Sequence, residues 1–154
     1  MKRHLIPEKI KSQTLNIMTF MGTPPFYIGL CLLLLPFSIK LCVTYLLAVV
    51  VTEIVCAIIK LVTRTERPTP RKRETLYDQY DASTFPSAHT ARIASNVSII
   101  VAAYPHIYFI LAGASMILAV AYSRLALKEH YSVDVIVGAF VGIATSLLIY
   151  HWMF

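Results

Sequence analysis

The sequence predicts an all-α, polytopic membrane helix bundle with about five transmembrane helices and an N-terminal interfacial helix. Of its 154 residues, 57% are hydrophobic and only 14% are charged, and the mean hydropathy is +0.67. Soluble domains carry about 25% charged residues, and a chain of this size leaves a large share of its surface exposed. Much of that surface must therefore face lipid. We expect a single membrane-embedded domain over residues 1–154.

The N-terminal part predicts an interfacial helix followed by a first span. Residues 5–21 mix apolar side chains such as Leu15 and Ile17 with charged ones such as Glu8, which suits a helix that lies in the membrane interface. A polar tail without fixed structure is the alternative for this segment. Residues 24–39 form the first candidate span, which opens with two prolines and is interrupted by a third.

Four further apolar segments follow. Residues 41–63 are the clearest of them, because a spanning helix needs about 20 mostly apolar residues. Residues 87–104, 107–123 and 133–153 complete the expected bundle. Between the second and third spans, residues 64–85 are rich in proline, charge and tyrosine, and predict a loop at headgroup level. Loops of this length are usually functional or disordered.

The three cysteines predict no special chemistry. Cys31, Cys42 and Cys56 all fall inside apolar stretches, without a CxxC or Cys/His spacing. This pattern indicates neither a disulfide framework nor a zinc site. We expect all three to pack as small hydrophobic side chains.

The charge distribution favours a lipid partner. The net charge is +6, and basic residues are concentrated near the N-terminus and in the loop after the second span. A basic surface beside a membrane suits anionic lipid headgroups, whereas nucleic acid is an improbable partner for so apolar a chain. No group of carboxylates suggests a metal, and we expect no metal ion and no cofactor.

Polar side chains gather at the span ends that share one face of the membrane. Charged groups near spans are costly and are therefore functional candidates. In an alternating bundle, the end of the second span, the start of the third, the end of the fourth and the start of the fifth lie on the same side. The polar residues at these four ends are Lys60, Arg67, Ser87, Ala88 with His89, Ser123 with Arg124, and His130 with Asp134.

This set of side chains suits phosphate chemistry. Arginine presents a planar fork that matches phosphate oxygens, and the N-terminus of the third span adds backbone N–H groups. His130 and Asp134 are four residues apart, so the carboxylate can orient one ring nitrogen and leave the other free. Each residue alone has a plainer explanation, such as snorkelling or a helix-start hydrogen bond. Their combination on one face favours one histidine as nucleophile and the other as general acid.

The spacing also resembles a known family. Lys60-(six residues)-Arg67-Pro68, then Pro86-Ser87-Ala88-His89, then Ser123-Arg124-(five residues)-His130-(three residues)-Asp134 resemble, in order, the three signature motifs of the type 2 phosphatidic acid phosphatase superfamily. The resemblance covers residues 60–134. Ala88 stands where the family often has glycine or aspartate, and no chemistry is required of that side chain.

The resemblance implies a fold and a mechanism that agree with the analysis above. His130 would attack phosphorus to form a phosphohistidine, Asp134 would orient it, and His89 would protonate the leaving lipid oxygen. The phosphate oxygens would be bound by Lys60, Arg67, Ser87, Ala88 and Arg124. No metal is needed. The implied substrates are lipid phosphates such as phosphatidylglycerophosphate, phosphatidic acid, undecaprenyl pyrophosphate or the 1-phosphate of lipid A.

Two further expectations concern the surroundings of the site. Glu53 lies seven residues before Lys60 on the same helix face, and Arg92 lies one turn below His89. We expect Glu53 and Arg92 to pair, because a buried charge needs a partner. The loop residues Tyr77, Asp78, Tyr80 and Asp81 either form a lid over a headgroup or are solvated filler.

The sequence gives conflicting indications about which side of the membrane carries the candidate site. Basic residues near span ends mark the cytoplasmic side, and they are more numerous on the face that carries the candidate site. Bacterial relatives usually place this site on the outer side. Because a phosphate site recruits basic residues for its own purposes, we expect an inner (plasma) membrane protein with its site on the periplasmic or extracytoplasmic face.

Three alternatives to a hydrolase stay open. A lipid phosphotransferase would pass the phosphoryl group to another lipid rather than to water. A non-catalytic lipid-binding or transport protein would not need the complete set of catalytic residues. Vanadium haloperoxidases share the site pattern, but a short membrane-embedded chain does not favour them. The oligomeric state is left open by the sequence.

Overall fold

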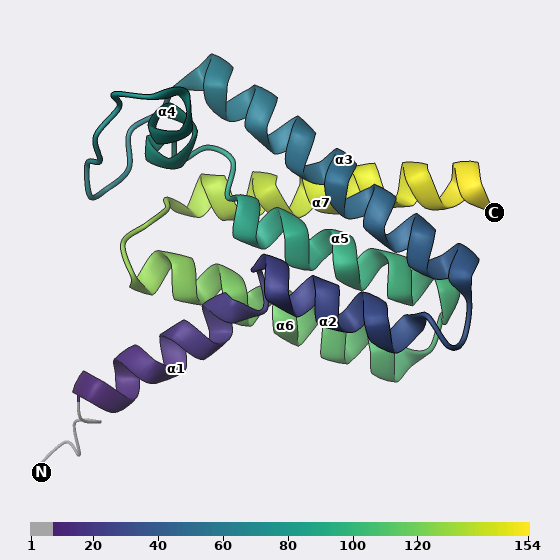
Figure 1. Ribbon diagram of the computed structural model, residues 1–154. Helices are drawn as coiled ribbons and strands as arrows, with labels where there is room; N and C mark the ends of the chain where they lie inside the picture. Colours follow the sequence, from purple (N-terminus) through teal and green to yellow (C-terminus); the bar gives the residue numbers. More distant parts are fainter. Residues whose placement is uncertain (1–7) are drawn as a thin grey trace, which may run out of the picture.

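The computed structural model describes residues 8–154, and this part of the chain is an all-α bundle, as predicted (Figure 1). The first residues of the expected interfacial segment, 5–7, which include Leu5 and Ile6, lie outside the described residues. The helices, in chain order, are α1 (Glu8–Phe20), α2 (Pro24–Leu34), α3 (Ile39–Thr63), α4 (Leu76–Ala82), α5 (Ala88–Ala103), α6 (Ile107–Ala126) and α7 (Ser132–Met153).

Helix α5 is the centre of the bundle and packs against α3, α6 and α7 (Figure 1). Its polar side chains Thr90, Ser95 and Asn96 are buried against these neighbours rather than exposed. Helices α5 and α7 approach especially closely, because a Cβ atom at Gly142 would lie 2.1 Å from the carbonyl oxygen of Ala91. Small residues allow such backbone contact between membrane helices. The central helix can therefore be polar without meeting lipid.

Among residues 8–154, three helices are individually long and apolar enough to cross a membrane: α3, α6 and α7. The pair α1 and α2 is bent by 51° and adds a fourth candidate if it is counted as one broken span. The remaining segments predicted as spans are helical but shorter, since α2 has 11 residues and α5 has 16. Helix α2 stops before the expected boundary at residue 39, where the chain turns after Leu34. The central position of α5 accounts for its lower hydropathy.

The bend between α1 and α2 lies against the start of α5. A Cβ atom at Gly22 would lie 2.7 Å from the backbone oxygen of His89, so only glycine allows this approach. The Gly22 carbonyl also accepts a hydrogen bond from Arg92 at 3.2 Å. Beyond the bend, α1 packs on α6, where the hydroxyls of Thr19 and Ser123 are 3.0 Å apart. That α1 lies in the membrane interface stays a prediction.

The expectation for the cysteines was wrong for two of the three. Cys31 near the end of α2 and Cys42 near the start of α3 form a disulfide, with their Cα atoms 5.6 Å apart. The hairpin between the two helices brings the side chains together, and residues 11 apart in sequence carry no local signal for such a pair. Cys56 is a buried free thiol, as expected.

The segment expected as a loop contains a short helix. Helix α4 begins with a capping box, in which the Thr75 hydroxyl accepts from the backbone of Asp78 and the Asp78 carboxylate accepts from the backbone of Thr75. This pattern of threonine and a carboxylate three residues later is a helix-start signal that the sequence contains. The two ends of the segment are joined, because the Thr84 N–H donates to the Thr65 carbonyl at 3.1 Å. The segment thus folds back over the end of the bundle.

Candidate active site

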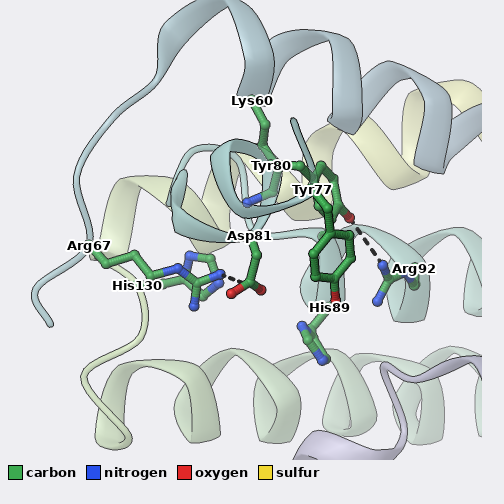
Figure 2. A pocket seen from close by; sticks show the side chains of 9 residues that line it. Lys60, Arg67, Tyr77, Tyr80, Asp81, His89, Arg92 and His130 are labelled. Atoms are coloured by element: carbon green, nitrogen blue, oxygen red, sulfur yellow. Dashed lines mark hydrogen bonds and ion pairs between the residues drawn. The ribbon is translucent and has the colours of Figure 1, made fainter. Parts of the chain in front are cut away.

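A polar cavity of about 200 Å³ lies under α4, at the end of the bundle where α3 ends and α5 and α7 begin (Figure 2). Five of the residues predicted for the site line it, from four separate segments of the chain. The remaining lining residues come from α4 and from the second turn of α5. The lining residues are Lys60, Arg67, Ala88, His89 and His130, together with Tyr77, Tyr80, Asp81 and Arg92.

Two side chains, those of Thr84 and Asp134, lie near the Nδ1 atom of His130, behind the cavity. The Thr84 hydroxyl lies 3.1 Å from Nδ1 and donates to Oδ2 of Asp134 at 2.5 Å. The same Asp134 oxygen lies 3.6 Å from Nδ1, which is longer than a normal hydrogen bond. Since the Thr84 proton is directed at Asp134, the Thr84 oxygen is free to accept the Nδ1 proton of His130. This tautomer leaves Nε2 unprotonated.

The surroundings keep His130 neutral. Burial lowers the pKa of His130, the hydrogen-bonded Asp134 raises it, and the nearby cations Lys60, Arg124 and Arg67 lower it again, so that the net shift is downward. The side chain is only 2% exposed. A neutral imidazole with a free nitrogen is the form that a nucleophile requires.

The start of α5 carries three predicted site residues in different positions. His89 lines the cavity from the first turn of α5, and Ala88 lines it beside His89. Ser87 is the N-cap residue and is fully buried, with its backbone N–H donating to the Asp134 carbonyl at 2.9 Å. The Ser87 hydroxyl accepts from Thr90 at 3.1 Å. Ser87 therefore joins α5 to α7 behind the cavity.

The predicted cations approach the same place from α3, from the loop after it and from α6. Lys60 is 2% exposed and donates to the Ser83 carbonyl. Arg67 and Arg124 are 8% and 7% exposed. Within residues 8–154, the Nε atoms of both arginines are buried and make no hydrogen bond. Buried donors are normally satisfied, so these two N–H groups are suited to the oxygens of a bound anion.

Two carboxylates lie among these cations: Glu129, which was not predicted, and Asp81, which was predicted only as a residue of a lid or of solvated filler. Glu129 pairs with Arg67, lies 2.8 Å from Arg71 and lies 3.6 Å from Arg124. Asp81, on α4, lies 2.5 Å from Arg71 and 3.8 Å from Arg67. The position of Glu129 directly before His130 was a signal for the first of them. For Asp81, the sequence left open whether the loop forms a lid over a headgroup or is solvated filler.

The predicted pair of Glu53 and Arg92 is confirmed. Arg92 donates to both carboxylate oxygens of Glu53, at 2.6 and 2.8 Å. The Tyr80 hydroxyl donates to the same carboxylate. It also accepts from Arg92 at 3.4 Å (Figure 2), so α4 is tied to both α3 and α5. Tyr77, Tyr80 and Asp81 all line the cavity, which favours the lid over solvated filler. Asp78 instead caps α4.

No group of three or more His, Cys, Asp or Glu side chains is placed to hold a metal ion within residues 8–154. The cavity is instead lined by cations, histidines and tyrosines, with Asp81 as the carboxylate. Such a donor-rich lining is suited to an anion with several oxygens.

Comparison with known proteins places this fold. The chain superposes on LpxE from Aquifex aeolicus with a TM-score of 0.78 at 17% identity, covering 96% of this chain and 88% of that one. It is also similar to a transmembrane PAP2-type phosphatidylglycerolphosphate phosphatase from Bacillus subtilis, with a TM-score of 0.75 at 20% identity and coverage of 96% and 78%. No curated protein matches the chain in sequence. The family model of the PAP2 superfamily matches residues 41–154, which contain every predicted site residue, and the chain belongs to that superfamily.

Proposed function

We propose that this protein is an integral membrane phosphatase that removes phosphate from a lipid headgroup, with His130 as the nucleophile. The observation that carries the proposal is the shared cavity: His130 and His89 line it together with Lys60 and Arg67, at the end of an apolar helix bundle. Membership of the PAP2 superfamily supports the same activity. The matched structure from Bacillus subtilis is described as a phosphatidylglycerolphosphate phosphatase, which supports a lipid phosphate as substrate.

In the first step, Nε2 of His130 attacks phosphorus and the bond between phosphorus and the lipid oxygen breaks. The electron pair leaves with the lipid oxygen, and His89 donates the proton that it needs. The products are a phosphohistidine and the lipid alcohol, or a lipid monophosphate when the substrate is a diphosphate. The relay through Thr84 to Asp134 stabilises the positive charge that develops on the His130 ring.

In the second step, water attacks the phosphohistidine and His89 takes the water proton. The bond between phosphorus and Nε2 breaks, which releases inorganic phosphate and returns His130 to its neutral state. Throughout both steps, Lys60, Arg67 and Arg124 bind the charged phosphate oxygens, next to the N-terminus of α5, where Ala88 lines the cavity. In phosphoryl transfer, such positioning and electrostatic stabilisation supply most of the catalysis.

The activity is tested by phosphate release from purified protein in detergent. A panel of phosphatidic acid, phosphatidylglycerophosphate, undecaprenyl pyrophosphate and lipid A 1-phosphate would identify the substrate, and we expect activity to persist in EDTA. Activity should vanish in His130→Ala and persist in His151→Ala, because His151 lies in the last turn of α7, away from the cavity. Lipid phosphates that all stay intact in the wild type would overturn the proposal. Product that forms only with an added acceptor lipid would identify a phosphotransferase.

We also propose that the cavity opens on the periplasmic or extracytoplasmic face of the inner membrane. Two observations favour the opposite orientation: the basic residues around the cavity, and the Cys31–Cys42 disulfide at the other end of the bundle, since disulfides persist in oxidising compartments. The first is expected of any phosphate site. The second involves a buried pair, which reductants do not readily reach.

Cysteine labelling in intact cells tests the orientation. Leu76 on α4 is 75% exposed and Phe37 in the turn between α2 and α3 is 79% exposed, at opposite ends of the bundle. A membrane-impermeant maleimide should label Leu76→Cys in intact cells and Phe37→Cys only after permeabilisation. The reverse pattern would place the cavity in the cytoplasm.

A further inference from the structure

Two of the cations expected to bind phosphate, Arg67 and Arg124, already face a carboxylate in this structure, and so does the neighbouring Arg71. Arg67 pairs with Glu129, and Arg71 bridges both carboxylates, at 2.8 Å from Glu129 and 2.5 Å from Asp81. Arg124 lies 3.6 Å from the same Glu129 oxygen. Figure 2 shows the Asp81 carboxylate directed into the cavity. The side chain of His89 lies on one side of it, and those of Arg67 and His130 lie on the other.

Glu129 stays charged in this environment. Burial opposes the ionisation of Glu129, but Arg67, Arg71 and Arg124 outweigh it and hold the pKa of Glu129 below its usual value. Asp81 is half-buried between two arginines. Without these two anions, three guanidinium groups and Lys60 would face one another in a largely buried site, which is costly.

The carboxylates and a phosphate compete for the same donors. Charge-assisted hydrogen bonds from arginine are made equally to carboxylate and to phosphate oxygens. An incoming phosphate therefore competes with Asp81 and Glu129 for the charge of Arg67, Arg71 and Arg124, even where its first contacts are the Nε groups of Arg67 and Arg124. The competition is not equal for substrate and product, because a lipid substrate is also held by its apolar chains in the membrane, whereas inorganic phosphate has only the cations.

We propose that Asp81 and Glu129 are internal competitors of phosphate, which weaken the binding of the inorganic phosphate product and speed its release. This inference rests on the proposed function. The two residues come from different elements: Asp81 from the lid helix α4 and Glu129 from the residue before the nucleophile. Return of Asp81 to Arg71 and Arg67 after each turnover closes α4 over the cations and excludes the phosphate that has left. Product release limits the rate of many enzymes.

The test is the inhibition constant of inorganic phosphate in Asp81→Asn and Glu129→Gln, which keep side-chain size and remove the charge. We expect each variant to bind inorganic phosphate at least about tenfold more tightly than the wild type, as expected for the loss of one competing charge near partly exposed cations. The KM should fall, and kcat should fall with it as product release slows. Glu74→Gln is the matched control: it removes one charge from the same loop, but Glu74 pairs only with the exposed Lys72.

A purely structural role predicts the opposite sign, because a distorted site binds phosphate more weakly. Unchanged or weaker phosphate binding in both variants would overturn the inference. If Asp81→Asn does not fold, Glu129→Gln still tests the inference. Asp81→Glu then serves as its partner, because it keeps the charge and should bind phosphate as the wild type does. Calorimetric titration with inorganic phosphate needs no turnover. Tighter binding in the variants of a protein that hydrolyses no lipid phosphate would therefore reject the proposed function and the role in product release, and keep only the competition between the two carboxylates and phosphate.

Discussion

The Thr84 hydroxyl is closer to Nδ1 of His130 than the Asp134 carboxylate is, at 3.1 Å against 3.6 Å. Thr84 donates its own proton to Asp134, so it carries the orienting effect of the carboxylate to the imidazole. The histidine and the aspartate of the expected pair are thus coupled mainly through a third side chain. That side chain comes from the loop before α5, 46 residues before His130 in the chain.

Removal of this hydroxyl should slow the first chemical step. In Thr84→Val the Nδ1 proton loses its acceptor, and Asp134 loses a donor. Because a hydrogen bond to a charged group contributes about 1.5–3 kcal/mol, kcat should fall about 10- to 100-fold with little change in KM. Thr84→Ser should restore most of the rate. Steady-state phosphate release measures both.

The matched control for Thr84 is Thr44→Val. Thr44 is fully buried, and its hydroxyl bonds only to the Lys40 carbonyl, near the other end of α3. It should leave kcat unchanged. Equal losses in the two variants would mean that any buried threonine is needed for folding, and that the relay has no part in catalysis.

The bend at Gly22 should tolerate no side chain. In Gly22→Ala the new Cβ would overlap the His89 backbone oxygen, and overpacking of this kind costs about 1–3 kcal/mol. We expect a lower melting temperature and a displaced His89, hence a lower kcat. Gly29→Ala is the control, since a Cβ there meets nothing within 4 Å and alanine favours the helix. If Gly22→Ala matched Gly29→Ala in both measurements, the packing of the bend on His89 would be unimportant.

Loss of the Glu53 charge should destabilise the lid and the central helix together. Glu53→Gln leaves the Arg92 guanidinium, whose side chain is 13% exposed, without its counter-ion, and it leaves one acceptor oxygen where Arg92 and Tyr80 now share two. We expect a loss of about 1–3 kcal/mol in the free energy of unfolding. Thermal unfolding in detergent measures it, with the exposed Glu74→Gln as the comparison. Unfolding midpoints that coincide would contradict a supporting role for the pair.

The pH dependence of activity should reflect the lowered pKa of His130. Protonation removes the nucleophile, so activity falls as pH falls through the pKa of His130. Because that pKa lies below the ordinary value of about 6.5, the acidic limb of kcat/KM should have its midpoint below that pH. Replacing Lys60 with glutamine removes a neighbouring cation, so the limb of its residual activity should move to higher pH. A midpoint at or above pH 6.5 in the wild type would contradict this account.

Much of the bundle and the position of the site followed from patterns that are local in sequence. Hydropathy placed α3, α6 and α7, and the alternation of spans placed His89 and His130 at one end. The Glu53–Arg92 pair was found because helix periodicity puts each residue below a site residue. These features depend on spacing within one helix or on the order of helices along the chain.

Features that depend on how distant segments fold back were not found. Thr84 reaches His130 because the segment before α5 folds back over the start of α7. No spacing in the sequence encodes that return. Cys31 and Cys42 meet because a hairpin sets the angle between two helices. Asp81 and Glu129 looked like ordinary loop charges, since their importance comes from the arginines that surround them. Two local signals went unused: the capping box at Thr75 and the position of Glu129 directly before His130.

The disulfide between α2 and α3 determines where α2 can separate from the rest of the protein. Its covalent tie lies at the end remote from the cavity, whereas near the cavity α2 is attached through the Gly22 carbonyl, which accepts from Arg92. One hydrogen bond is far weaker than a covalent link. At that end the chain also continues into α1, which packs on α6 through Thr19 and Ser123. The end of α2 beside His89 therefore depends on noncovalent contacts of the α1–α2 bend, and an outward swing of α2 would begin at this end, next to the reacting phosphate.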